Sequence, residues 1–336
     1  MFLKYGSLNK LTNHWVGVLA VAILLLIGLK ASAQIGRKDI SVHDPVIIRQ
    51  DSTYYIFCTG NGISVWSSID MLNWKREKPV FAQAPKWAVD SIPGFKGYIW
   101  APDISFHNGT YYLYYSVSVF GKNTSAIGMA TNKTLNPESP DFKWVDHGLV
   151  IQSRPGKTNW NAIDPNLIAD EKGVPYLVFG SFWGGIKMLK LNTDRLSFAE
   201  DIDHLRTIAS RKTTGEREAN AIEAPFIFKK DEYYYLFASI DYCCKGPASN
   251  YKMIVGRSKN IKGPYLDGQG IDLKHGGGTA VLQPDSNWYG AGHNAVATFN
   301  GNDYLVFHGY DAHDNGRPKL RILKLTWKNG WPNVYD

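Results

Sequence analysis

Short apolar runs separated by polar turns fill the chain from residue 37 onward, and helical periodicity is nearly absent. The runs come in pairs. In each pair a polar or acidic residue stands beside Pro or Asn, two or three apolar residues follow, and a polar turn leads into a second run that a tyrosine opens. This pattern predicts two strands joined by a tight turn, a β-hairpin.

The hairpin recurs five times. Its tyrosine returns every 57 to 69 residues, and further β-rich runs follow each copy, so that one unit has room for four short strands. Five such units predict an all-β fold, a five-bladed β-propeller with four-stranded blades. The alternative, two stacked β-sandwiches, would not explain five equivalent hairpins. The repeated tyrosines are Tyr55, Tyr112, Tyr176, Tyr235 and Tyr304.

The first 33 residues have the composition of an export signal. Lys4 and Lys10 precede an apolar run over residues 16–29, and Ala31-Ser32-Ala33 supplies the small residues of a cleavage site. The run is shorter than the roughly 20 residues of a membrane-spanning helix. We therefore expect an exported protein, periplasmic or extracellular, whose residues 34–336 form one propeller domain. An uncleaved membrane anchor is the alternative.

The amino-acid composition limits the classes of molecule that this protein is expected to bind. A formal charge of +7 without long basic clusters argues against a nucleic-acid binder, and 44% hydrophobic residues exclude a disordered chain. Eleven Trp and nineteen Tyr suit stacking on sugar rings, although sheet packing accounts for most of them. No protein partner is predicted.

Three cysteines are too few for a disulfide framework. Because adjacent cysteines rarely bridge, we expect Cys243 and Cys244, like Cys58, to be buried free thiols. The sequence contains no CxxC pair and no HExxH motif, the patterns that would suggest a zinc site.

Four acids and a histidine stand at the starts of the five units. In a propeller the first strand of each blade lines the central channel, so these residues should meet in one cavity. Paired carboxylates across a cavity are what glycoside hydrolysis needs, one to protonate the leaving oxygen and one to activate water. The alternative is that the acids cap strands or hold a structural cation. The five are Asp44, Asp103, Asp164, Glu223 and His293; Asp103 follows its proline, so we expect its side chain to point elsewhere.

Motifs in every unit carry a resemblance to glycoside hydrolase family 43, and within it to endo-1,5-α-L-arabinanases. The resemblance covers residues 37–333. Its motifs are His43-Asp44-Pro45, Trp100-Ala101-Pro102-Asp103, Asn161-Ala162-Ile163-Asp164-Pro165, Ser181-Phe182-Trp183-Gly184-Gly185, Glu223-Ala224-Pro225 and Gly292-His293-Asn294.

The resemblance implies an inverting mechanism. Asp44 matches the general base, Glu223 the general acid, and Asp164 the third acid that orients Glu223 and raises its pKa. Inversion requires carboxyl groups roughly 6.5–9.5 Å apart, with water between them. His293 matches a channel histidine that sits at a central cation, commonly calcium, held largely by water; a hydrogen-bonded histidine without metal is the alternative.

Sugar contacts are expected from several further positions. Trp100 could stack on an arabinose ring or pack within its blade, and His43 could do either beside the base. Asn161, Ser181, Phe182 and Trp183 match sugar-contacting positions of the family. The corner at Phe120-Gly121 is a further wall, because Gly permits close backbone approach. The loop Tyr242-Cys243-Cys244-Lys245-Gly246 also resembles an arabinanase loop.

The leading hypothesis is an exported enzyme that cleaves the backbone of plant arabinan, or arabino-oligosaccharides, by endo attack. An exo-acting α-L-arabinofuranosidase or β-xylosidase of the same family is the first alternative. A non-catalytic carbohydrate-binding propeller is the second, and the presence of all three matching carboxylates speaks against it. A sialidase-like propeller lacks the arginine cluster it would need at the blade starts.

Overall fold

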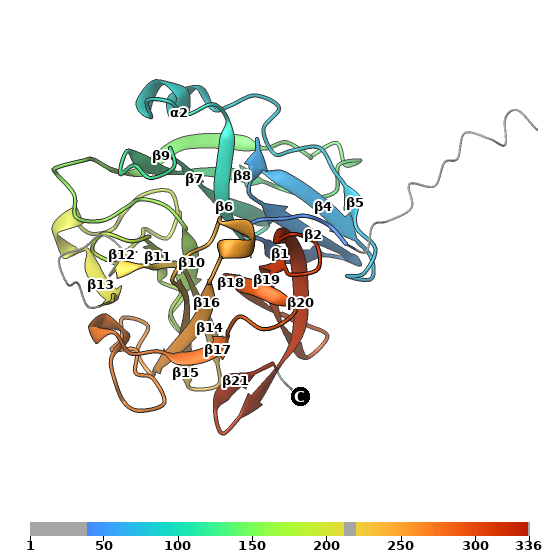
Figure 1. The fold of residues 1–336 in the computed structure, drawn as a ribbon. Helices are drawn as coiled ribbons and strands as arrows, with labels where there is room; N and C mark the ends of the chain where they lie inside the picture. Colours follow the sequence, from blue (N-terminus) through green and yellow to red (C-terminus); the bar gives the residue numbers. More distant parts are fainter. Residues whose placement is uncertain (1–38, 212–219, 335–336) are drawn as a thin grey trace, which may run out of the picture. The chain divides into compact units, whose positions relative to one another are not determined.

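The computed structural model describes residues 39–211 and 220–334, which form five antiparallel sheets that follow one another along the chain. Blade 1 has the strand order β1-β2-β4-β5, blade 3 β10-β11-β12-β13, blade 4 β14-β15-β16-β17 and blade 5 β18-β19-β20-β21. Blade 2 runs β6-β7-β8-β9 and carries the two-residue strand β3 beside β6. The predicted propeller of four-stranded blades is confirmed, and Figure 1 shows the first strands of the blades nearest its middle.

The strands have the following bounds. Blade 1 contains β1 (Val46–Gln50), β2 (Thr53–Cys58), β4 (Ser64–Ser68) and β5 (Lys75–Arg76). Blade 2 contains β3 (Gly60–Asn61), β6 (Tyr98–His107), β7 (Thr110–Val117), β8 (Ser125–Asn132) and β9 (Val145–Ser153). Blade 3 contains β10 (Asn166–Ala169), β11 (Pro175–Phe179), β12 (Ile186–Lys190) and β13 (Arg206–Ala209).

The last two blades and the short helices complete the described part. Blade 4 contains β14 (Ile222–Lys230), β15 (Tyr233–Ile240), β16 (Lys252–Ser258) and β17 (Thr279–Leu282). Blade 5 contains β18 (Trp288–Phe299), β19 (Asn302–Asp311), β20 (Arg317–Lys328) and β21 (Trp331–Asn333). The helical segments are the α-helix α2 (Lys86–Ser91) and the 3₁₀ turns η2 (Ile202–His204), η4 (Gly246–Ala248) and η5 (Leu273–His275).

The hairpin turns explain why the sequence repeats so visibly. In four blades the first and second strands are joined by two residues, and the first of these has a positive φ of 46° to 53°. Asn and Asp tolerate this left-handed conformation best after Gly, which accounts for the turn residues that recur in the sequence. The four residues are Asp51, Asn108, Asp231 and Asn300.

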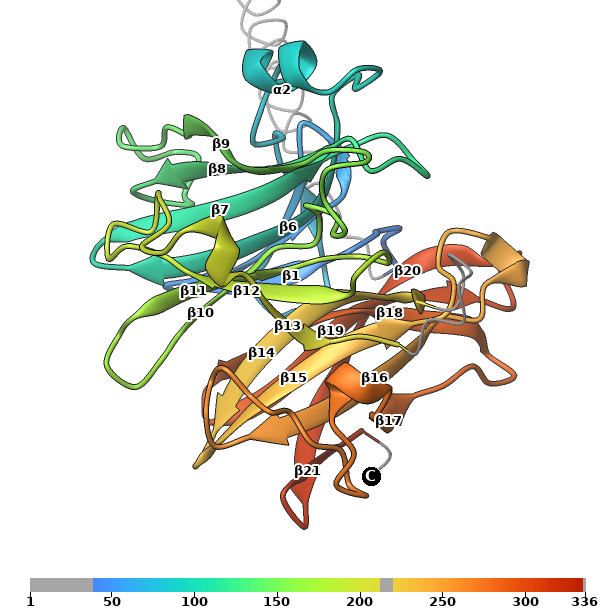
Figure 2. The same cartoon turned by 90° about the vertical axis from the view of Figure 1, so that its left-hand side faces the viewer.

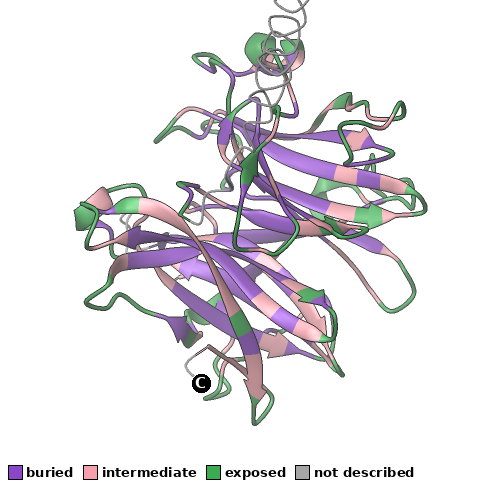
Figure 3. Cartoon of the chain, turned by 90° about the vertical axis from the view of Figure 1, so that its right-hand side faces the viewer, coloured by how far each residue is buried: buried purple, intermediate pink, exposed green. Residues whose placement is uncertain are grey.

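Apolar side chains from neighbouring blades hold the ring together. Five hydrophobic clusters each join two successive blades, including one between blades 5 and 1 that contains Val306 and Ile56. Buried residues accordingly follow the strands, whereas exposed residues gather in the connecting loops (Figure 3). Figure 2 shows the strands of neighbouring blades packed face to face.

Blade 1 and blade 5 are also joined by polar contacts. The Leu320 N–H donates to the Ile40 carbonyl at 3.0 Å, and Lys319 Nζ lies 2.7 Å from the Asp39 carboxylate. Residues ahead of β1 therefore pair with β20, which connects the two ends of the described chain.

The cysteines and the N-terminal segment were the subject of two sequence-based predictions. The structure contains a disulfide between Cys243 and Cys244, so the prediction of free thiols at these positions is wrong, while Cys58 is free and buried as expected. The error came from the general rarity of bridges between adjacent cysteines: here Cys244 has a positive φ of 66°, and the two sulfurs are bonded. The predicted export signal, residues 1–33, lies outside the described residues, among which no helix is long and apolar enough to cross a membrane.

Candidate active site

Five residues with left-handed backbone stand at the starts of the five blades. Each directly precedes a proline or, in blade 5, an asparagine, and their φ angles lie between 44° and 58°. In blades 2, 4 and 5 the strand register shifts at this point, so the chain bulges where it enters the sheet. The five residues are Asp44, Ala101, Asp164, Ala224 and His293.

This geometry corrects the equivalence assumed from the sequence. Alanines, not acids, occupy the equivalent place in blades 2 and 4. Glu223 reaches the site from the residue before Ala224. Asp103 points elsewhere, as expected: its carboxylate accepts the Leu167 N–H at 2.7 Å and joins blade 2 to blade 3. Burial raises the pKa of this carboxyl to about 7, against the hydrogen bonds that Leu167 and Asn166 donate.

A ring of hydrogen bonds fixes these five positions. The backbone N–H of each residue donates to a side chain of the preceding blade, at distances of 2.8 to 3.1 Å. The acceptors, taken from Asp44 around to His293, are His308, Thr59, Ser116, Asp164 and Ser239. Each left-handed residue is therefore anchored to the neighbouring blade by its backbone N–H, which fixes the position of the Cα atom from which its side chain extends.

Asp44 is an ionised carboxylate with a partner on each oxygen. His293 Nδ1 lies 3.0 Å from Oδ1, and the Thr59 hydroxyl donates to Oδ2 at 2.5 Å. Burial alone would raise the pKa of Asp44, but the charge and hydrogen bond of His293 outweigh it and lower this pKa far below its usual range. Its side chain keeps 17% of its surface exposed, so water can reach it.

Glu223 has the opposite electrostatic character. The Ser181 hydroxyl donates to Oε2 and the Tyr251 hydroxyl to Oε1, both at 2.8 Å. Burial raises the pKa of Glu223, against these two donors and the positive charge of His293, and the negative charge of Asp44 adds to the rise. The carboxyl therefore keeps its proton to a higher pH than an exposed glutamate would.

Asp164 connects the acid to the rest of the ring. Its Oδ2 accepts the N–H of Ala224 at 3.0 Å, which fixes the backbone next to Glu223. The side chain is buried, and burial raises the pKa of Asp164 to about 8. The charges of Glu223 and Asp44 add to this rise, whereas His293 opposes it. Asp164 and Glu223 therefore both keep a proton to higher pH than exposed acids would, and together they carry less than two negative charges near neutral pH.

His293 is the cation among these acids. Burial would lower its pKa, but the charges of Asp44, Asp164 and Glu223 outweigh burial and raise the pKa of His293 to about 9. Such mutual effects require the four groups to lie close together. The structure thus brings together four of the five predicted residues.

The surroundings of His293 suit a calcium ion in charge but supply few ligands. Its Nδ1 is bonded to Asp44, while Nε2 has no hydrogen-bond partner among the described residues. Glu223 uses both oxygens on hydroxyl donors, and Asp44 uses both on Thr59 and His293. Because calcium takes six to eight oxygen ligands, an ion here would fit only with most of them supplied by water.

His43, Asp44 and His308 also bring ligand atoms within 4.8 Å of one another. Both ring nitrogens of His308 are engaged, however, because Nδ1 accepts the Asp44 N–H at 3.1 Å and Nε2 lies 3.2 Å from the Tyr310 hydroxyl. Burial lowers the pKa of both His43 and His308. In this trio His308 accepts the Asp44 N–H, and the ring of His43 packs on the ring of His308.

The predicted sugar-contacting residues divide into two groups. Trp100, Phe182 and Trp183 are half-buried, and Phe120 is 78% exposed beside Gly121, whose φ is 74°. These side chains can meet a ligand.

The second group faces protein. Asn161 is buried, and its amide oxygen accepts from Ser153. Ser181 bonds to Glu223, and the half-buried ring of His43 packs 4.5 Å from that of His308. Ser181 therefore contacts one of the acids directly, and His43 packs on the histidine that accepts the Asp44 N–H.

Sequence reasoning missed Thr59, Tyr251, His308 and Tyr310. A signal for two of them was present, because the residue four places after the repeated tyrosine is polar in four units: Thr59, Ser116, Ser239 and His308. Each of these side chains accepts one of the ring hydrogen bonds. Tyr251 and Tyr310 lie outside this pattern, and only the fold brings them to the site.

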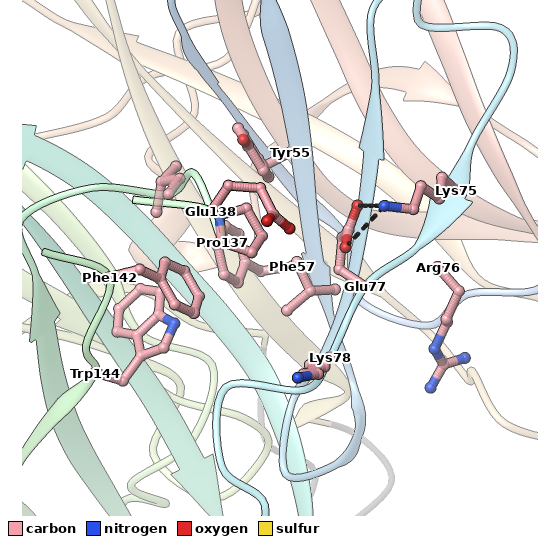
Figure 4. Close-up of a pocket in the computed structure, with 12 residues that line it drawn as sticks. Tyr55, Phe57, Lys75, Arg76, Glu77, Lys78, Pro137, Glu138, Phe142 and Trp144 are labelled. Atoms are coloured by element: carbon pink, nitrogen blue, oxygen red, sulfur yellow. Dashed lines mark hydrogen bonds and ion pairs between the residues drawn. The ribbon is translucent and has the colours of Figure 1, made fainter. Parts of the chain in front are cut away.

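A cavity of about 490 Å³ lies elsewhere, at the outer edge between blades 1 and 2 (Figure 4). Phe142 and Trp144 line one side, and Glu77 faces it with Lys75 at 3.1 Å. None of the three clustered acids lines this cavity, so it is separate from the candidate active site.

Comparison with known proteins agrees with the geometry. Residues 38–332 match the glycosyl hydrolases family 43. The chain belongs to this family. It is a glycoside hydrolase, and the expectation from its motifs is confirmed.

Three proteins of similar sequence illustrate what this chain resembles. An extracellular exo-α-(1→5)-L-arabinofuranosidase, ArbA, of Cellvibrio japonicus is 48% identical over 327 residues, covering 96% of this chain and 93% of that protein. An extracellular endo-α-(1→5)-L-arabinanase of Bacillus subtilis is 44% identical over 296 residues, covering 87% of each. The solved Cellvibrio cellulosa α-L-arabinanase in complex with arabinohexaose has 49% identity and a TM-score of 0.85, covering 88% of this chain and 96% of that one.

Proposed function

We propose that this chain hydrolyses the α-1,5-L-arabinofuranosidic bonds of arabinan with inversion, Asp44 serving as general base and Glu223 as general acid. The observation that carries the proposal is the opposite electrostatic character of these two carboxyls within one cluster. Glycoside hydrolysis by inversion needs one ionised and one protonated carboxyl on opposite sides of the bond.

The steps follow from the contacts. Asp44, ionised and partly exposed, accepts a proton from a water molecule as that water attacks the anomeric carbon. Glu223 delivers its proton to the departing oxygen, so that the leaving sugar departs as an alcohol. Asp164 holds the backbone beside the acid, because its Oδ2 accepts the Ala224 N–H.

Arabinan is the substrate that the relatives favour. Both curated relatives are named for α-(1→5)-linked L-arabinofuranose, and the solved relative holds arabinohexaose. Trp100 and Phe182 are half-buried and Phe120 is exposed, so we expect their ring faces to contact such a ligand. Both curated relatives are also called extracellular, in agreement with export directed by residues 1–33.

Endo attack, expected from the motifs, and exo attack both occur among the relatives. The relative named as exo-acting is the more similar of the two curated proteins, which favours exo attack as a second candidate. Product lengths from linear arabinan distinguish them. Mixed oligomers at the earliest times support endo attack. A single product of fixed length supports exo attack and contradicts endo attack.

Inversion is tested by proton NMR on arabino-oligosaccharides during the first turnovers. We expect the newly formed reducing end to appear first as the β anomer and then to equilibrate. First appearance of the α anomer would contradict the assignment of Asp44 as base, because it would require a covalent intermediate. Xylan and xylo-oligosaccharides serve as control substrates, and their preferential cleavage would contradict the arabinan proposal.

For the metal, we propose a calcium ion held mostly by water, with His293 Nε2 as its protein ligand once binding has displaced the proton from this nitrogen. When bound, it supplies positive charge beside Asp44, Asp164 and Glu223. Exhaustive chelation should lower activity severalfold, and calcium but not sodium should restore it. Full activity in the metal-free protein, with no calcium detected by elemental analysis beforehand, would leave His293 as a hydrogen-bonding residue only.

A further inference from the structure

The disulfide turn of blade 4 contacts a tyrosine of blade 5. Cys243 and Cys244 lie in the loop between β15 and β16, and the Cys244 N–H donates to the Tyr310 hydroxyl at 2.7 Å. The same hydroxyl lies 3.9 Å from Cys244 Sγ, to which it donates. Tyr310 is buried at the end of β19, so the disulfide turn covers its hydroxyl group.

Tyr310 in turn contacts His308, which is fully buried. The Nε2 atom of His308 lies 3.2 Å from the Tyr310 hydroxyl, and its Nδ1 lies 3.1 Å from the Asp44 backbone nitrogen. Since a backbone N–H can only donate, Nδ1 must accept and carries no proton. The neutral ring therefore has its proton on Nε2 and donates it to Tyr310.

Every donor in this chain of contacts is then assigned. The Tyr310 oxygen accepts from Cys244 and from His308, and its own proton points to Cys244 Sγ. The other tautomer of His308 would turn a ring N–H toward the Asp44 N–H, so that two donors would face each other. The backbone of Asp44 would then lose the hydrogen bond that supports its left-handed conformation, whose φ is 52°.

We infer that Tyr310, backed by the Cys243–Cys244 turn, is a positioning residue: it fixes the tautomer of His308 and thereby the backbone from which Asp44 presents its carboxylate. The inference rests on the proposed role of Asp44 as general base. The disulfide contributes because it holds Cys244 in a left-handed turn with φ of 66°, from which its N–H reaches Tyr310.

The first test is Tyr310→Phe, which removes one oxygen atom and keeps the ring. We expect kcat to fall about tenfold while KM stays within about twofold, because the base shifts without a change in the sugar contacts. Tyr265→Phe is the matched control: its buried hydroxyl also takes part in a hydrogen bond, which it donates to the Ile261 carbonyl, and lies away from the acids. A kcat for Tyr310→Phe equal to that of the control would contradict the inference.

A second readout needs no substrate. The ¹⁵N shifts of histidine side chains distinguish protonated from unprotonated ring nitrogens, and the His308 signals are those missing from His308→Asn. We expect the Nε2–H tautomer in the wild-type protein and a mixture of tautomers in Tyr310→Phe. If the wild-type ring carries its proton on Nδ1, or if Tyr310→Phe leaves the tautomer unchanged, the inference is wrong even if the enzyme acts on arabinan.

The disulfide turn is tested by combining variants. Cys243→Ser with Cys244→Ser should lower kcat by less than Tyr310→Phe, and should lower it no further when Tyr310 is already Phe, because both changes act through one hydroxyl. Additive losses would contradict a shared route. Inactivity of the wild-type protein on arabinan, with the expected tautomer change intact, would refute the proposed function and leave the link from Tyr310 to His308 standing.

Discussion

The two ends of the candidate reaction lie in regions of contrasting chemistry. Asp44, between blades 5 and 1, faces the cationic His293 and takes a short hydrogen bond from Thr59. Glu223, between blades 3 and 4, has only the neutral hydroxyls of Ser181 and Tyr251 as hydrogen-bond partners among the described residues. Both carboxyls suffer burial, yet only the first has a charged partner that outweighs it.

This difference shows how one fold obtains an ionised and a protonated carboxyl from similar side chains. One of the five equivalent positions of the ring is Asp44, and Glu223 directly precedes another, Ala224; the groups beside each carboxyl decide its protonation. At Asp44 the charge and hydrogen bond of His293 outweigh burial, and the pKa falls; at Glu223 burial outweighs the two hydroxyl donors and the charge of His293, and the pKa rises. The contrast predicts that changes at the two corners have distinguishable consequences.

The largest effect is expected from Asp44→Asn. Asn accepts the left-handed backbone and matches the carboxylate in shape, so the fold should persist while the base is lost. We expect kcat on linear arabinan to fall about 10³-fold or more. Asp103→Asn is the matched control, a buried acid of the inner strands outside the cluster. The assignment is supported if Asp103→Asn loses stability but keeps a near-normal kcat, while Asp44→Asn keeps its stability and loses kcat. Similar kcat values for the two variants would refute it.

An intermediate effect is expected at Thr59. Thr59→Val removes the hydroxyl that orients Asp44 and leaves its shape, so kcat should fall about tenfold. Thr298→Val is the control, since Thr298 donates to Asp303 at 2.6 Å in blade 5 with the same donor and acceptor types. Steady-state kinetics on arabino-oligosaccharides provide the measurement, and equal kcat values for the two variants would show that Thr59 has no part in orienting the base.

The smallest effect is a displacement of the pH profile at the Glu223 corner. Ser181 and Tyr251 donate to the ionised form of Glu223 and so lower its pKa. Ser181→Ala or Tyr251→Phe should therefore raise this pKa, and the acid would stay protonated to higher pH. We expect the alkaline limb of kcat/KM to move to higher pH in both variants. A shift to lower pH, or none, would contradict Glu223 as the group that sets this limb.

The sequence predicts the fold well because the fold is repetitive. Tyrosine-led hairpins and their Asn and Asp turns recur once per blade, and each hairpin needs only local residues to form. The clustering of Asp44, Asp164, Glu223 and His293 follows from the same repeat, and the resemblance to family 43 supplied their expected roles.

What the sequence did not reveal depends on contacts between blades. Ala101 and Ala224 share the backbone conformation of Asp44, but no side-chain chemistry marks them. Tyr251 follows a loop of blade 4, and Tyr310 ends a strand of blade 5, so neither falls on the repeated positions. The Cys243–Cys244 bond depends on a left-handed residue that a pattern of apolar and polar positions does not indicate.

The central claim is that Asp44 and Glu223 have different roles, and the leaving group tests it most directly. Kinetics should be compared on an arabino-oligosaccharide and on an aryl α-L-arabinofuranoside whose phenolate departs without protonation. We expect Glu223→Gln to lose far more activity on the oligosaccharide than on the aryl substrate, and Asp44→Asn to lose it equally on both. Equal losses for Glu223→Gln, or recovery of Asp44→Asn on the aryl substrate, would contradict the account.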